Sequence, residues 1–156
     1  MRTIQHRERT LVIERVFDAP RELVYSTWTD AEHIDQWWGP TGVTTRTIER
    51  NFTVGGSWIY AMSWPGSDGE KQVESKYDEI VPGEKIVWTE SIPGDASNVV
   101  NITIMFEDQG GETKLTILML HRSVEQKDMN EQGGMLNGYN MVLDGFTTYL
   151  SENTSS

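Results

Sequence analysis

The stretch KIVWTESIPGDASNVVNITIMFEDQGGETKLTILMLH, residues 85–121, decides the fold class, because its apolar side chains recur at every second position. This period is typical of half-buried strands, and it predicts strands at Lys85–Ser91, Asn98–Asp108 and Thr113–His121. The turn residues Pro93-Gly94-Asp95 and Gly110-Gly111 separate them. Connections this short join antiparallel strands. The stretch therefore predicts an antiparallel meander.

The same period extends toward the amino terminus. It predicts four more strands, at Thr10–Phe17, Val43–Arg50, Ser57–Trp64 and Lys71–Val81. Between the first and second of these strands, the sequence favours two short helices instead. Asp18 is expected to cap the first helix, with Pro20 in its first turn, and Asp30 the second, which Gly39-Pro40 ends.

The carboxy-terminal part of the chain is predicted to be helical. Ser123 and Gln126 form a candidate capping box, and Gly133-Gly134 is expected to interrupt the helix, which then runs to about Leu150. Gly134, Gly138 and Gly145 fall on one stripe beside its apolar face. Glycine costs about 1 kcal/mol against alanine in a helix interior. The stripe indicates either close packing against the sheet or room left for a ligand.

The predicted elements specify one architecture. A single sheet and one long helix can bury their apolar faces together only if the sheet curls around the helix. We therefore predict an α+β fold: a curved seven-stranded antiparallel sheet around a long carboxy-terminal helix, with two short helices after the first strand. All 156 residues are expected to form one domain with an ordered core of about 10–151. Such a trough commonly leaves a hollow beside the helix.

The inward faces of the strands and the long helix supply candidate residues for this hollow. They are Trp58, Tyr60, Met62, Trp88, Glu90, Ile104, Met119, His121, Met135 and Tyr139. Glu90 and His121 end their strands at one rim and are expected about 10 Å apart across an intervening strand, on two sides of one small molecule. Singly, such a glutamate is more often solvated, such a histidine structural and such tryptophans part of the core. Together they predict a ligand pocket.

Composition excludes several other functions. Twenty-four acidic against thirteen basic residues leave a charge of −11, which disfavours nucleic acid and an anionic membrane surface as partners. Without cysteine there is no disulfide or thiolate chemistry. The charged start and the lack of a long apolar run favour a soluble protein in the cytoplasm. The three scattered histidines and the absence of nucleophile, phosphate or metal motifs predict no catalytic residue, metal site or cofactor.

Several motifs, in order along most of the chain, resemble one family. They are Arg15-Val-Phe-Asp-Ala-Pro20, Trp28-Thr-Asp30, Trp37-Trp38-Gly39-Pro40, Gly55-Gly56-Ser57-Trp58, Asp68-Gly69, Tyr77-Asp-Glu-Ile-Val-Pro82, Glu84-Lys-Ile-Val-Trp-Thr89 and Gly138-Tyr139 through Leu143-Asp144. The chain resembles bacterial homologues of the activator of the ninety-kilodalton heat-shock chaperone ATPase, in the START/SRPBCC superfamily.

This resemblance implies the helix-grip fold and a deep hydrophobic cavity beside the long helix. Family members often have tryptophan where this chain has Tyr139, so the resemblance implies a different pocket wall there. It implies no reaction, because the superfamily includes carriers, cyclases and chaperone partners. Three functions follow: binding of a small hydrophobic or aromatic ligand, a cyclase- or dehydratase-like reaction with Glu90 or His121 as general base, or a chaperone partner acting through its surface.

Overall fold

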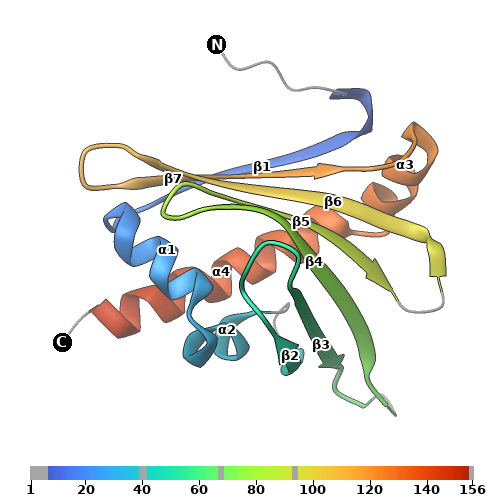
Figure 1. Ribbon diagram of the computed structural model, residues 1–156, viewed down its shortest axis with the longest axis horizontal. Helices are drawn as coiled ribbons and strands as arrows, with labels where there is room; N and C mark the ends of the chain where they lie inside the picture. The colour runs from blue at the N-terminus through green and yellow to red at the C-terminus, as the bar shows by residue number, and fades with distance from the viewer. Residues whose placement is uncertain (1–6, 39–41, 67–68, 93–94, 155–156) are drawn as a thin grey trace.

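A seven-stranded antiparallel sheet dominates the computed structural model, which describes residues 7–38, 42–66, 69–92 and 95–154. After the 3-10 turn η1 (Arg7–Arg9), the elements are β1 (Thr10–Phe17), α1 (Arg21–Thr29), α2 (Ala31–Trp37), β2 (Thr44–Arg50), β3 (Ser57–Ser63), β4 (Lys71–Val81), β5 (Lys85–Ile92), β6 (Asp95–Asp108), β7 (Thr113–Leu120), α3 (Val124–Gln132) and α4 (Met135–Thr154). Figure 1 shows this sheet with the long helix α4 across it.

The strand order β1-β7-β6-β5-β4-β3-β2 is that of a meander in which the first strand returns to the last. β2 to β7 follow one another through the sheet, and β1 lies at the edge beside β7, with Thr10 opposite Leu120. The predicted antiparallel connections are thus confirmed. Most strand ends match the prediction; four differ from it by one residue, and the start of β6 differs by three.

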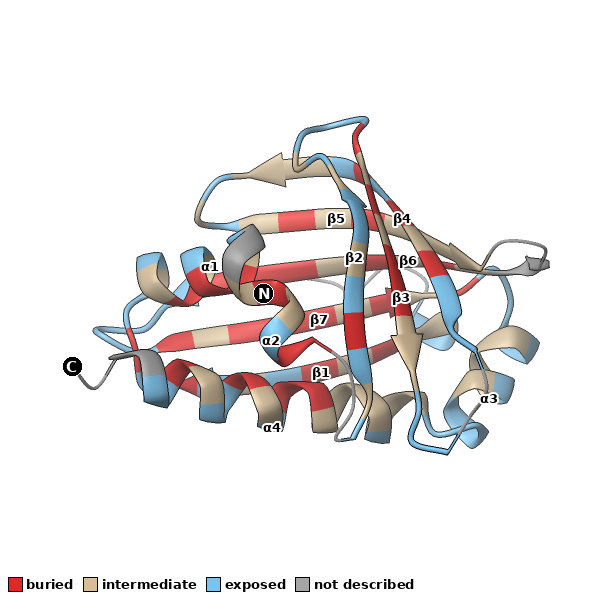
Figure 2. Cartoon of the chain, turned by 90° about the horizontal axis from the view of Figure 1, so that it is seen from below, coloured by how far each residue is buried: buried red, intermediate tan, exposed pale blue. Residues whose placement is uncertain are grey.

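The sheet curls around α4 and leaves a trough. Its pairing register shifts between Thr47 and Glu49, between Tyr77 and Glu79, and between Glu90 and Ile92. Such irregularities bend a strand and increase its twist. Figure 2 shows buried residues recurring along the strands and on α4. The curled sheet and long helix predicted from the sequence are both present.

Helices α1 and α2 fill one end of the trough with aromatic side chains. Phe146 of α4 is completely buried, and its ring centroid lies 5.2 Å from that of Phe17, 5.1 Å from that of Trp28 and 4.6 Å from that of Trp37. These edge-on contacts are the usual geometry of aromatic clusters. The cluster joins β1, α1, α2 and α4, and it leaves the opposite end of the trough less filled.

Two predicted helix caps differ in the structure. Pro20, not Asp18, stands at the N-cap of α1, with no side-chain hydrogen bond, because the helix begins later than the sequence suggested. Ser123 caps α3 by accepting from the Gln126 amide, but the Gln126 side chain accepts from the Arg122 amide instead of closing the capping box. The expected stop at Gly39-Pro40 and part of the Pro93-Gly94-Asp95 turn lie outside the described residues, as do Met1–His6, Asp68 and Ser155-Ser156.

The glycine stripe splits into three roles. Gly134 precedes α4 with a φ of +92°, so it makes the turn between α3 and α4 rather than lying in the long helix. A Cβ at Gly145 would lie 3.5 Å from the Trp37 carbonyl oxygen, so this position serves close packing against α2. A Cβ at Gly138 would meet no atom within 4 Å. Close packing therefore accounts for Gly145, while Gly138 leaves open space beside α4.

Candidate functional site

A cavity of about 330 Å³ lies between the concave face of the sheet and the start of α4. β3, β4, β5 and β6 form its sheet wall, and the end of α3 and the first two turns of α4 form the other. Trp38, which follows α2, borders it toward the aromatic cluster. This volume is at the lower end of the range for small-molecule sites.

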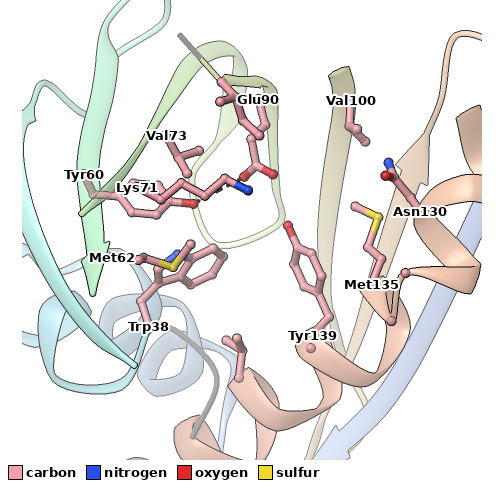
Figure 3. A pocket seen from close by; sticks show the side chains of 15 residues that line it. Trp38, Tyr60, Met62, Lys71, Val73, Glu90, Val100, Asn130, Met135 and Tyr139 are labelled. Carbon is pink, nitrogen blue, oxygen red and sulfur yellow. Dashed lines mark hydrogen bonds between the residues drawn. The ribbon is translucent and has the colours of Figure 1, made fainter. Parts of the chain in front are cut away.

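Five of the ten predicted residues line this cavity: Tyr60, Met62, Glu90, Met135 and Tyr139. They come from β3, β5 and α4, so segments far apart in the sequence meet here. Figure 3 shows the Tyr60 and Tyr139 side chains reaching into the space from opposite sides, with the Glu90 carboxylate between and above them.

The other predicted residues lie outside the lining. Trp58 stacks on Tyr60 with ring centroids 4.2 Å apart, and its indole N–H donates to the Thr47 hydroxyl at 3.1 Å. Trp88 is buried beneath the cavity, and Ile104 and Met119 are completely buried in the core. These residues are on the predicted face of the sheet but at positions along their strands that lie below the cavity. Trp88, Ile102 and Met119 share one row across the sheet, while Glu90 and Val100 form the next row, nearer the opening.

His121 is also buried away from the cavity. Its amide donates to the Arg9 carbonyl, and its Nδ1 lies 3.1 Å from that oxygen and 3.0 Å from the Met119 carbonyl. The ring is therefore held by backbone at the point where β7 ends. The expected arrangement of Glu90 and His121 on two sides of one molecule is not formed around this cavity. His121 Nε2 is buried without a hydrogen-bond partner among the described residues.

Glu90 is the acidic group of the cavity. Burial raises its pKa, while the Trp88 indole, the Tyr60 hydroxyl and the Lys71 ammonium act in the opposite direction. The Tyr60 hydroxyl lies 3.5 Å from Glu90 Oε1, at the limit of a hydrogen bond. The Trp88 N–H lies close enough to the Glu90 carboxylate to lower its pKa. It does not form a well-aligned hydrogen bond with any described atom. The Glu90 carboxylate thus has few hydrogen-bond donors for a buried charged group.

The two cavity tyrosines are protonated donors over the whole ordinary pH range. Burial raises the pKa of Tyr60 well above 10, and the nearby Glu90 charge raises it further. Burial and Glu90 act on Tyr139 in the same way. Both phenols can therefore donate to a bound molecule or to Glu90.

Sequence reasoning missed several lining residues. Trp38 stands in the sequence only as part of a family motif, yet its ring also borders the cavity. Lys71 has the same alternation as the inward-facing Val73, a signal that was present in the sequence. Gly138 was flagged by the stripe, and its missing side chain contributes open space. Asn130 had no signal, because α3 buries none of its residues.

The described ranges contain no group of three histidine, aspartate or glutamate side chains able to hold a metal ion. Likewise, no helix within them is long and apolar enough to cross a membrane. The site is instead an apolar cavity with one carboxylate, two phenols and a lysine at its opening.

Comparison with known proteins gives the same fold. A solution structure from Arthrobacter aurescens has a TM-score of 0.86 and 24% identity, covering 93% of this chain and 87% of that one. A crystal structure from Nitrosomonas europaea has a TM-score of 0.85 and 18% identity, covering 97% and 99%. The AHSA1 protein from Silicibacter pomeroyi has a TM-score of 0.74 and 18% identity, covering 92% and 99%. These likenesses confirm the helix-grip fold. No protein with a curated description matches the chain.

The sequence itself matches a family model over residues 18–151. This range includes α1, α2, α3, the strands β2 to β7 and most of α4. The cavity-lining residues all lie within this range. The expected relationship is thereby confirmed: the chain belongs to the family of Activator of Hsp90 ATPase homolog 1-like proteins.

Proposed function

We propose that this protein binds a small apolar or aromatic molecule in the cavity between the sheet and α4, and that it does so in the cytoplasm. The observation that carries the proposal is the unfilled 330 Å³ space beside Gly138, where α4 has no side chain. A tightly packed core tolerates few voids larger than a water molecule. A hollow of this size, with polar groups converging on it, is the usual form of a ligand site.

The walls can supply the affinity. Burial of about 200 Å² of apolar ligand surface at roughly 25 cal/mol per Å² contributes about 5 kcal/mol. The loss of ligand freedom offsets part of this gain. Glu90 and the two tyrosines then orient the ligand, because each would otherwise remain poorly hydrogen-bonded.

Filling the cavity tests the proposal. Gly138→Leu places a side chain in open space, whereas Asn137→Leu changes the neighbouring exposed position of the same helix. The probes are an aromatic and fatty-acid panel followed by amide chemical shifts. We expect shifts around β3, β5 and α4 in the wild type and in Asn137→Leu, and none in Gly138→Leu. Shifts confined to the outer surface would contradict the proposal.

A co-purifying molecule would identify the ligand. Native mass spectrometry of protein isolated from its own cells should show a mass above that of the chain. The same preparation of Gly138→Leu should lack it. Equal occupancy of both proteins would place the molecule elsewhere.

A cyclase- or dehydratase-like reaction is a second candidate, favoured by the desolvated carboxylate of Glu90. A general base works best when its pKa approaches the operating pH, and burial moves the pKa of Glu90 in that direction. His121 does not line the cavity, and its ring lies against the Arg9 and Met119 carbonyls. An enzyme would turn over a bound panel member with a pH profile that disappears in Glu90→Gln.

A chaperone partner is the third candidate, supported by the family to which the chain belongs. This function would use the outer surface and not the cavity. It predicts capture of the ninety-kilodalton chaperone and stimulation of its ATPase by the wild type and by Gly138→Leu alike. Silence in both assays would remove this candidate.

A further inference from the structure

Three aromatic rings and one carboxylate surround the inner part of the cavity. The Trp38 ring lies 6.1 Å from the Tyr60 ring at 84° and 6.2 Å from the Tyr139 ring at 87°, centroid to centroid. Both tyrosines thus stand nearly perpendicular to the indole. Figure 3 shows Tyr60 and Tyr139 on two sides, Trp38 below and the Glu90 carboxylate above. We call these four residues the aromatic–acid box.

The box combines a carboxylate with three aromatic rings around one small space. Aromatic faces attract cations, and the attraction strengthens when water is removed. The carboxylate accepts up to about four hydrogen bonds. Of the described residues, Tyr60 places its hydroxyl 3.5 Å from Glu90 Oε1, and the Trp88 indole N–H also acts on this carboxylate. An acceptor with this much unused capacity beside π faces suits an ammonium group.

Lys71 is the cation nearest to this box. It begins β4, is exposed, and reaches across the opening toward Glu90, as Figure 3 shows. Its charge lowers the pKa of Glu90, but no ion pair between described residues joins the two side chains. The lysine is thus an exposed counter-ion near the Glu90 carboxylate that forms no ion pair with it among the described residues. A ligand cation inside the box would approach the carboxylate more closely.

We propose that the ligand is an organic cation: an apolar or aryl body with a primary or quaternary ammonium group, which the aromatic–acid box holds. The inference rests on the ligand-binding function proposed above and specifies the chemical class. Met62, Met135 and Val142 then contact the apolar body. The net charge of −11 favours the approach of cations over long range. An anionic ligand would meet the Glu90 charge.

A matched series of probes tests the charge requirement. The probes are 3-phenylpropylamine, 3-phenylpropanol and 3-phenylpropanoate, which share one apolar body and differ in charge. By isothermal titration calorimetry we expect the amine to bind at least tenfold more tightly than the alcohol, with the carboxylate weakest. In Glu90→Gln the amine should lose this tenfold advantage while the alcohol is nearly unaffected.

Two variants serve as controls. Glu84→Gln removes the same charge from an exposed position just before the start of β5, and it should leave the preference unchanged. Lys71→Met removes the competing cation at the opening, and it should tighten amine binding several-fold. Weaker amine binding in Lys71→Met would contradict the assigned role of the box.

The wild type provides a test that needs no variant. Trimethyl(3-phenylpropyl)ammonium keeps its charge at every pH, so changes in its affinity report protein groups alone. Its binding should weaken as acid protonates Glu90, whose charged and titratable neighbours are Tyr60, Lys71 and Tyr139. Affinity independent of pH across the carboxyl range would overturn the inference.

The outcomes separate the two proposals. Binding of the alcohol or the carboxylate as tight as that of the amine would refute the organic-cation class and leave the ligand-binding function standing. If none of the three probes and no member of the wider panel binds, the ligand-binding function itself fails.

Discussion

The Tyr60 hydroxyl lies 3.5 Å from Glu90 Oε1, and these two residues belong to strands that do not touch each other. β4 runs between β3 and β5, so the contact passes over a whole strand. Ser75 of β4 is opposite Glu90 and is buried with its hydroxyl unpartnered among the described atoms. The curl of the sheet therefore brings a carboxylate toward a phenol while leaving nearby polar atoms without partners. Buried polar atoms without hydrogen bonds reduce the stability of the folded state.

Glu90→Gln is expected to raise the free energy of unfolding at neutral pH. Burial raises the folded-state pKa of Glu90 above its ordinary value, so the folded state binds the proton more tightly than the unfolded state. The free energy of unfolding of the wild type therefore rises as pH falls through the folded-state pKa of Glu90. Above that pKa the ionised carboxylate destabilises the folded state. The advantage of Glu90→Gln should be largest at neutral pH and vanish below about pH 4, where both states are protonated.

Urea unfolding from pH 7.5 to pH 3.5 measures this difference. Glu84→Gln, at an exposed position, provides the control for loss of one negative charge. A Glu90→Gln protein that is less stable than the wild type at pH 7.5 would show that the carboxylate is well satisfied in the folded state.

Gly138→Ala is expected to stabilise the protein by about 1 kcal/mol, because alanine restricts the unfolded chain and favours the helix. The new Cβ meets no atom within 4 Å. Gly56→Ala should have the opposite effect, since its Cβ would lie 2.2 Å from the Asn51 carbonyl oxygen. Thermal unfolding of both variants checks the contrast, and a destabilised Gly138→Ala would mean that the space beside α4 is smaller than described.

Mildly acidic solution should destabilise the wild type through His121. Burial lowers its pKa, and Lys127 acts in the same direction, so the unfolded state takes up the proton first. Stability contributed by neutral His121 is therefore present above about pH 6.5 and lost as pH falls below it. His121→Gln should flatten this part of the stability curve in urea titrations at pH 7.5 and 5.5. His33→Gln should keep the acid-side loss, and an unchanged slope in His121→Gln would assign it to other groups.

Phe146→Ala should destabilise the protein by about 3–5 kcal/mol, the usual cost of removing a buried phenylalanine. Its ring is completely buried among Phe17, Trp28 and Trp37. Thr148→Ala, exposed two residues further along α4, should change stability by less than about 0.5 kcal/mol. Denaturant midpoints give both values. A small effect of Phe146→Ala would mean that the cluster does not hold α4 against the sheet.

The fold was predictable because alternation is a local property that survives in the structure. Trp58, Tyr60, Trp88 and Ile104 are buried, as expected from the inward face that alternation predicts for them. The start of α1 was not predictable in the same way. Asp18 is a suitable cap by residue type, but Pro20 occupies the N-cap, and only the packing of the following turn selects one start over another.

The sequence predicts which side of each strand faces the site. It does not predict which residues on that side reach the cavity. Period two places Trp88 and Glu90 on the same side of β5, about 6.6 Å apart along the strand. Only Glu90 reaches the cavity, because Trp88 is buried with its ring centroid 6.4 Å from that of Trp38, which borders the cavity. That boundary depends on contacts between distant elements. The prediction that His121 lines the cavity was wrong for a related reason. Its ring lies against the carbonyl of Arg9, a residue distant in sequence.

The closure of β1 on β7 has a consequence for biosynthesis. β1 pairs with β7, in which Leu120 is opposite Thr10. During translation β1 therefore cannot form its native pairing until β7 has been synthesised. α4, which covers the trough, emerges later still. Contacts this remote in sequence slow folding and prolong the exposure of apolar surface. The nascent polypeptide should therefore acquire protease resistance in a single late step, after β7 and α4 have both cleared the exit tunnel.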